Sequence, residues 1–202
     1  RTGRVHEATG VSATDAKTVS GTDLRKLLDL RSTWFTVGWL ALAPPTAPLV
    51  YGGAASLAGL ARGIGPVALE SRVPGGLWQP AGTPVPSATG AFTTIVRPQL
   101  TTEYRLAAGT IRAALAKVPV APRVDATIAS GSASGKIAPP IVGAAVQLQR
   151  QDGVTWTTIG TAATDLTGAF AVQSTDVAPG TYRVRVAPGH GLVPGVSATA
   201  VG

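Results

Sequence analysis

The sequence predicts a mainly β protein built around a duplicated domain. Aromatic residues and a Gly-Ala-Phe motif recur without a gap, so that each member of the second set follows its counterpart by the same number of residues. A match of this kind across three aromatic anchors is the mark of an internal repeat. The pairs are Trp78 with Trp156, Phe92 with Phe170, and Tyr104 with Tyr182.

The second repeat, residues 122–202, shows the strand pattern more clearly. Between Tyr182 and Val186, apolar residues alternate with Arg183 and Arg185, which places the arginines on the opposite face of a strand. Short alternating segments separated by Gly, Asp and Pro turns predict an all-β sandwich. The segment also resembles carboxypeptidase-regulatory-like β-sandwiches in its turn and strand pattern.

The first repeat, residues 47–121, follows the same plan, and a proline-rich joint at 118–124 predicts a short, semi-rigid connection. We therefore predict two tandem immunoglobulin-like antiparallel β-sandwiches, at 47–121 and 122–202, preceded by a small α+β segment at 1–46. The aromatic anchors are expected to build the cores, the tryptophans included. This predicted repeat core is Trp78, Phe92, Tyr104, Trp156, Phe170 and Tyr182.

The N-terminal segment has a different pattern. Residues 4–8 are expected to form a strand, and Ser20 to Asp23 form a capping box that predicts a short helix ending near Leu30. Leu24, Leu27 and Leu28 would be its apolar stripe.

An apolar run follows the helix and predicts a strand that needs cover on both faces. Burying its large side chains is worth about 1.5–3 kcal/mol each. We expect it to pack against another chain or a neighbouring domain, and strand addition between copies would allow a fibre. The alternative is that residues 1–46 fold back on the first sandwich. The predicted contact residues are Trp34, Phe35, Val37, Trp39, Leu40 and Leu42.

Three short motifs, Gly3-Arg4-Val5, residues 19–25 and residues 28–35, resemble the end of the SpoIID/LytB domain, the family of stage II sporulation protein D. That family contains secreted wall proteins of Gram-positive bacteria, some of which cleave denuded peptidoglycan glycan strands. The resemblance covers residues 3–37 and implies an extracellular, cell-wall location. The family's catalytic carboxylate lies upstream of the matching stretch, so no position here corresponds to it.

Composition narrows the possible functions. Charged residues are 13% of the chain, against about 25% in an average soluble domain, and there is no Cys. The net charge of +7 is spread along the chain without a basic cluster, which argues against nucleic-acid binding. Prolines and glycines interrupt the longest uncharged run, residues 32–61, so no transmembrane span is expected.

No residue set predicts a catalytic, cofactor or metal site. His6 and Glu7 are adjacent on a strand and point to opposite faces. Glu70 and Glu103 could form a carboxylate pair for glycan chemistry, but solvated charges are the simpler interpretation. His190 has no neighbouring ligand, and Asp165 is expected to cap a turn and not to bind calcium.

Three functional classes stay open. The first is a non-enzymatic structural or adhesive protein of a bacterial cell surface, self-associating through 34–42. The second is a peptidoglycan-positioning tail of a SpoIID-type wall-lytic enzyme. The third is a carbohydrate-binding module. Two of these classes share a compartment, and we predict an extracellular location at the cell wall or cell surface, with the chain itself or a wall glycan as partner and no cofactor.

Overall fold

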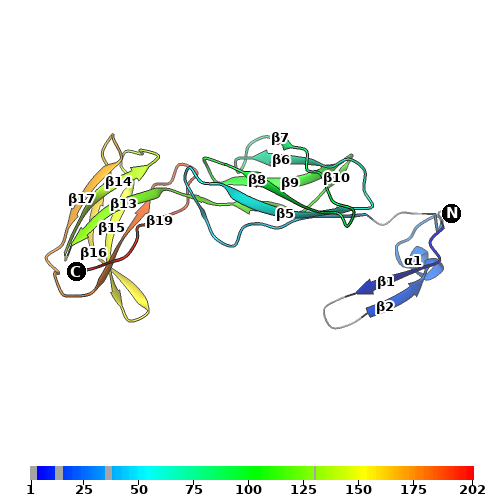
Figure 1. The fold of residues 1–202 in the computed structure, drawn as a ribbon, viewed down its shortest axis with the longest axis horizontal. Helices are drawn as coiled ribbons and strands as arrows, with labels where there is room; N and C mark the ends of the chain where they lie inside the picture. The colour runs from blue at the N-terminus through cyan, green and yellow to red at the C-terminus, as the bar shows by residue number, and fades with distance from the viewer. Residues whose placement is uncertain (1–3, 12–15, 35–37, 130) are drawn as a thin grey trace.

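The computed structural model describes residues 4–11, 16–34, 38–129 and 131–202. Figure 1 shows a chain of β-sheets with one short helix near the N-terminus. The elements divide into an N-terminal hairpin with its helix and two sandwiches. Within the described residues, no helix is long and apolar enough to cross a membrane.

The N-terminal part consists of the antiparallel hairpin β1 (Glu7–Val11) and β2 (Ala16–Ser20), followed by α1 (Gly21–Leu27). The predicted cap is present: the Ser20 hydroxyl accepts a bond from the Asp23 backbone N–H at 3.1 Å. The predicted apolar stripe is not buried, because Leu27 and Leu28 are both exposed. The short helix packs near the hairpin through Gly21, whose N–H donates to the His6 carbonyl.

The first sandwich consists of two antiparallel sheets. One has the order β3-β5-β8, and the other has the order β10-β9-β6-β7, with β11 also paired to β9. The bounds of these strands are β3 Trp39–Leu42, β5 Ala55–Arg62, β6 Ala68–Arg72, β7 Gln79–Gly82, β8 Ala91–Val96, β9 Thr102–Ala108, β10 Ile111–Arg112 and β11 Ala116–Val118.

The second sandwich repeats this topology strand for strand. Its sheets have the orders β13-β14-β17 and β19-β18-β15-β16, with β20 also paired to β18. The duplication predicted from the aromatic spacing is therefore present in the strand order. The strands are β13 Arg123–Ala129, β14 Ser132–Ala138, β15 Ala145–Asp152, β16 Thr155–Ala163, β17 Ala169–Gln173, β18 Thr181–Ala187, β19 Gly195–Val196 and β20 Ala200–Val201.

Each sandwich has one apolar core between its two sheets. Leu57, Leu69 and Leu106 are fully buried in the first core, and Leu148 and Val184 in the second. Strand alternation produces this arrangement, since every second residue of β18 is buried and its neighbours are not. Among the predicted core aromatics, Tyr104, Phe170 and Tyr182 lie in these clusters and Phe92 packs against the first.

Trp78 and Trp156 do not lie in the cores, contrary to prediction. Both are half-buried and absent from the core clusters. Each lies on the outer face of its sandwich, where arginine guanidinium groups stack on the ring. The repeated tryptophans therefore indicate the duplication correctly, although arginines cover their indoles and the opposite sheet does not.

The second half of the apolar segment 34–42 belongs to the first sandwich, which is the intramolecular alternative given for it, and only the domain boundary differs from prediction. Strand β3 pairs antiparallel with β5, so the sandwich begins before the expected boundary at residue 47. Leu42 is buried in the first core and Leu40 packs against it, whereas Trp34 and Trp39 are exposed. Phe35 and Val37 lie outside the described residues.

The joint between the sandwiches is hydrogen-bonded on both sides. Strand β12 (Val120–Ala121) pairs in parallel with β4 (Leu49–Val50) of the first sandwich. On its other side, the N–H of Val193 from the second sandwich donates to the Val120 carbonyl at 2.8 Å. The chain therefore passes between the sandwiches as a paired strand, in agreement with the semi-rigid connection expected from its prolines.

A threonine links the two sandwiches directly at this joint. Thr101, from the loop before β9, donates its backbone N–H to the carbonyl of Gly191 in the second sandwich at 2.8 Å. Its hydroxyl oxygen accepts the backbone N–H of Val120 at 3.2 Å. Thr101 and Val120 are both buried, so water does not compete for the bond between the Val120 N–H and the Thr101 hydroxyl.

Candidate functional site

The outer face of the first sandwich bears a ladder of arginines around one indole. The guanidinium carbons of Arg105 and Arg72 lie 3.9 and 4.5 Å from the centre of the Trp78 ring. Both arginines also pair with a carboxylate, Arg105 with Glu70 and Arg72 with Glu103, each at 2.7 Å. Cation–π stacking and ion pairing therefore act on the same side chains.

Strand register explains why this ladder forms. Glu70 of β6 faces Arg105 of β9, and Arg72 faces Glu103 two residues along. Directly opposed charges of opposite sign stabilise a sheet pair. Arg112 adds a third cation, with its Nε 3.4 Å from Glu70 Oε2. Glu70 and Glu103 thus lie on one face, as the carboxylate-pair hypothesis required, but each is bound to arginine and the two form no acid–base pair.

The second sandwich repeats the indole and one arginine but not the carboxylates. The Arg183 guanidinium carbon lies 4.0 Å from the centre of the Trp156 ring. Its Nε donates to Gln149 Oε1 at 2.9 Å, and Gln149 faces Arg183 in the register that Glu70 has with Arg105. Gln149 thus occupies the place of Glu70, so the second ladder has a neutral amide where the first has a negative charge.

Arg185 continues this carboxylate-free ladder. It faces Gln147 across β15 and β18, and its Nη1 donates to Gln147 Oε1 at 3.1 Å. Burial, and next the neighbouring charge of Arg185, lower the pKa of Arg183. Two cations therefore lie close together on this face without an acidic partner among the ion pairs of the described residues.

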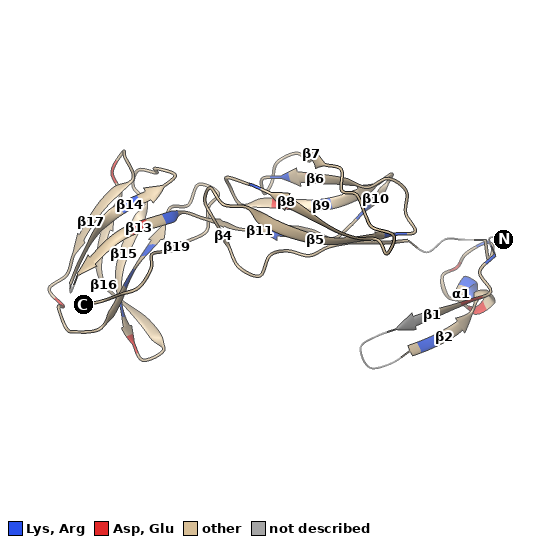
Figure 2. Ribbon diagram, in the orientation of Figure 1, with Lys and Arg blue, Asp and Glu red and all other residues tan. Residues whose placement is uncertain are grey.

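The acidic residues of the second sandwich lie away from this face (Figure 2). Asp125 is on β13 in the other sheet, where it pairs with Arg123, and Asp176 pairs with Arg150. Asp152 ends β15 at its hairpin, and Asp165 lies in the turn before β17. The outward positions of β15 and β18 are accordingly uncharged or basic.

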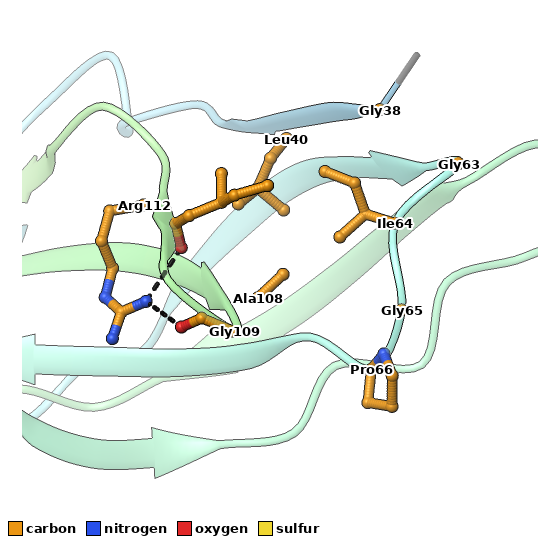
Figure 3. A pocket seen from close by; sticks show the side chains of 10 residues that line it. Gly38, Leu40, Gly63, Ile64, Gly65, Pro66, Ala108, Gly109 and Arg112 are labelled. Atoms are coloured by element: carbon orange, nitrogen blue, oxygen red, sulfur yellow. Dashed lines mark hydrogen bonds between the residues drawn. The ribbon is translucent and has the colours of Figure 1, made fainter. Parts of the chain in front are cut away.

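A cavity of about 420 Å³ opens at one end of the first sandwich (Figure 3). Glycines, Leu40, Ile64 and Ile111 line most of it, and Arg112 is the charged residue among the described lining residues. The Arg112 Nη1 donates to the carbonyls of Gly109 and Ile111 at 2.6 and 2.9 Å. The Arg112 guanidinium is thus engaged by those carbonyls and by Glu70, and no carboxylate or imidazole is among the described lining residues.

Two other residues considered as site candidates from the sequence are Asp165 and His190. The Asp165 carboxylate caps the turn before β17, accepting bonds from the Thr167 N–H and hydroxyl and the Ala169 N–H. The Thr167 hydroxyl, and next the two backbone N–H groups, hold the pKa of Asp165 below its ordinary value. His190 Nδ1 lies 2.9 Å from the Pro188 carbonyl oxygen.

The histidine and acidic residues do not gather into a metal site. In the described ranges, no three His, Asp or Glu side chains lie in a group that could hold a metal ion. His6 and Glu7 lie at the start of β1, both exposed. The residues that sequence analysis missed are the ladder arginines and glutamines, whose signal was an Arg or Gln at alternate positions of paired strands.

Comparisons with known proteins found similar chains among the solved structures. No family model and no curated protein matches the chain. The human OSCAR ligand-binding domain is 16% identical, covers 81% of this chain and 97% of that domain, with a TM-score of 0.27. A tetra-tandem repeat from the extending region of a large adhesion protein is 17% identical, covering 97% of this chain and 55% of that chain, with a TM-score of 0.34.

The strand pairing itself establishes the architecture. The chain contains two tandem immunoglobulin-like β-sandwiches. At these TM-scores the similarity to the two solved structures has no bearing on function. The resemblance of residues 3–37 to the SpoIID/LytB family finds no support in the comparisons and stays a hypothesis from sequence.

Proposed function

We propose that this chain is a non-enzymatic structural or adhesive segment of a bacterial cell surface, in which two sandwiches form one rigid spacer. The observation behind the proposal is the joint. Its connecting strand is hydrogen-bonded to β4 on one side and to Val193 on the other, and Thr101 bonds to both the strand and the second sandwich. Domains in one chain move independently unless such an interface holds them.

The outer faces support a role in binding or spacing over one in catalysis. The carboxylates that could act as acid and base, Glu70 and Glu103, are each paired with an arginine at 2.7 Å. In the part of the chain that the structure describes, Arg112 is the single charged residue that lines the first-sandwich cavity. A surface with few charges suits an extracellular or densely packed environment, which is the location that we propose.

The joint can be tested by its effect on domain motion. Replacing Thr101 with valine removes the hydroxyl that accepts the buried Val120 N–H, a loss of about 1–3 kcal/mol. In ¹⁵N relaxation measurements on the full chain, we expect the two sandwiches to share one rotational correlation time in the unmodified protein and to diverge in Thr101→Val. Thr93→Val, at an exposed position of β8, is the control. Two separate correlation times in the unmodified chain would refute the spacer proposal.

Self-association stays a prediction, and fewer apolar side chains of segment 34–42 support it than the sequence suggested. Because Leu42 is buried within the chain, the exposed apolar side chains among the described residues of this segment are Trp34 and Trp39, which are 60% and 61% exposed. Strand β3 is at the edge of its sheet, and sheet edges can accept a strand from another copy. We expect sedimentation coefficients to rise with concentration, and to rise less in Trp39→Ser. A monomer at every concentration would end the filament hypothesis.

A further inference from the structure

We propose that the outer face of the second sandwich binds an acidic polysaccharide, whose carboxylate groups pair with Arg183 and Arg185. This inference rests on the proposed surface role and names the class of partner. It depends on a difference between two faces that share one topology. On the face of the first sandwich, each arginine of the ladder lies beside a carboxylate. The face of the second sandwich has the corresponding indole and arginine, but glutamine stands in place of Glu70.

The neutral amides leave the two charges of the second face available to a ligand. Gln149 and Gln147 orient the arginines by accepting one bond from each, at 2.9 and 3.1 Å. An amide oxygen orients a guanidinium without neutralising it, while a carboxylate would do both. Burial is the main cause of the lowered pKa of Arg183, and the nearby charge of Arg185 adds to it. An incoming anion would relieve this repulsion.

The geometry favours a polymer over a single small anion. Arg183 and Arg185 are two residues apart on one strand and point the same way, so their Cα atoms lie about 7 Å apart. A chain with repeated carboxylates can engage both at once, which raises its affinity over that of one group.

The chemistry around the arginines favours a sugar chain over an acidic peptide. Trp156 is half-buried, so part of its indole stays exposed to the C–H groups of a sugar ring. The exposed Thr158, two residues further along β16, presents a hydroxyl group on the same face. A peptide bound to a sheet makes backbone hydrogen bonds along an edge strand. The central strands β15 and β18 are paired on both sides and offer no such edge on this face.

The test measures binding of the full chain to polygalacturonate by isothermal titration. Two comparison polymers separate charge from sugar. The methyl ester of polygalacturonate has the same sugar backbone without the charge, and poly-L-glutamate has the charge without the sugar. We expect binding to polygalacturonate that weakens with added salt, and binding at least about tenfold weaker to each comparison polymer. Equal binding to poly-L-glutamate would overturn the polysaccharide assignment, and no binding to polygalacturonate would overturn the site.

Variants locate the binding on this face. Arg185→Gln should weaken binding about tenfold, as expected for losing one charge-assisted contact. Arg97→Gln, which removes the same charge from an exposed position at the end of β8, should leave the affinity within about twofold. Equal losses in the two variants would mean attraction to net charge alone and would overturn the proposal.

The decisive variant is Gln149→Glu, which retains both arginines. It installs under Arg183 the carboxylate that Glu70 places beside Arg105, with the Nε–Oε1 geometry already formed. Binding should fall about tenfold, while thermal unfolding shows that the variant is folded. Unchanged affinity in folded Gln149→Glu would overturn the proposal. The relaxation test of Thr101 is independent of these results, so failure here would leave the rigid-spacer proposal standing.

Discussion

Replacing Leu148 with alanine should lower the free energy of unfolding of the second sandwich by about 2–5 kcal/mol. Leu148 is fully buried in the middle of β15, between β16 and β18, and belongs to the core with Val184 and Tyr182. Truncation removes its packing and leaves a cavity that the paired strands on both sides cannot close. That loss is a large share of the stability of a small domain.

Chemical denaturation of the full chain measures the effect. Val154→Ala is the control, because Val154 is 97% exposed at the neighbouring hairpin and its truncation should change stability by less than about 0.5 kcal/mol. Leu69→Ala, at the matching position of β6, should destabilise the first sandwich in the same way. A Leu148→Ala effect below 1 kcal/mol would mean that the second core packs differently from the structure described.

The duplication could be predicted from sequence because core positions of a sandwich are fixed by strand alternation and turn spacing. Tyr182, Val184 and Val186 alternate with Arg183 and Arg185, and the structure buries the first three and turns the arginines outward. Because the aromatic residues of the two repeats are separated by a constant offset, the same strand pattern could be predicted for the first repeat. Matching strand orders in the two sandwiches are the structural counterpart of that offset.

The role of the tryptophans was predicted wrongly. Trp156 faces Gln151, which shares the outer face of β15 with Gln149. Alternation along β16 alone does not show this, because Ile159 and Ala162 both pack against the second core although the strand is irregular between them and Trp156. Strand alternation also does not predict which side chain covers the Trp156 indole. Arg183 stacks on it, and this contact depends on the cross-strand register, including the irregularity between Leu148 and Gln149.

The domain boundary was misplaced for a similar reason. Residues 39–42 look apolar on both faces, and the sequence alone gives no partner for them. The structure pairs them with β5, which buries Leu42 and leaves Trp39 exposed at the sheet edge. The pairing of β12 with β4 could not be predicted from the sequence either, because a parallel ladder of two residues is too short to show a periodic pattern.

A second large effect is expected at a glycine that both repeats place opposite a phenylalanine. Gly59 faces Phe92, and Gly135 faces Phe170, in the same antiparallel ladder. A Cβ at Gly59 would lie 2.1 Å from Phe92 Cζ, a side-chain atom, whereas a Cβ at Gly135 would lie 2.1 Å from the Asp125 backbone carbonyl oxygen. Alanine at either position should destabilise its sandwich, by about 1–3 kcal/mol for overpacking.

The two sites should differ in how they are rescued. In a Phe92→Ala background, Gly59→Ala should cost nothing or become favourable, because the three atoms nearest to the added Cβ all belong to the removed ring. The coupling energy in that double-mutant cycle should be about 1–3 kcal/mol. In a Phe170→Ala background, Gly135→Ala should cost as much as before, since the Asp125 carbonyl belongs to the β13–β14 ladder and cannot move without breaking it. Rescue at both positions would show that the phenylalanine ring, and not the neighbouring backbone, sets the requirement for glycine in both repeats.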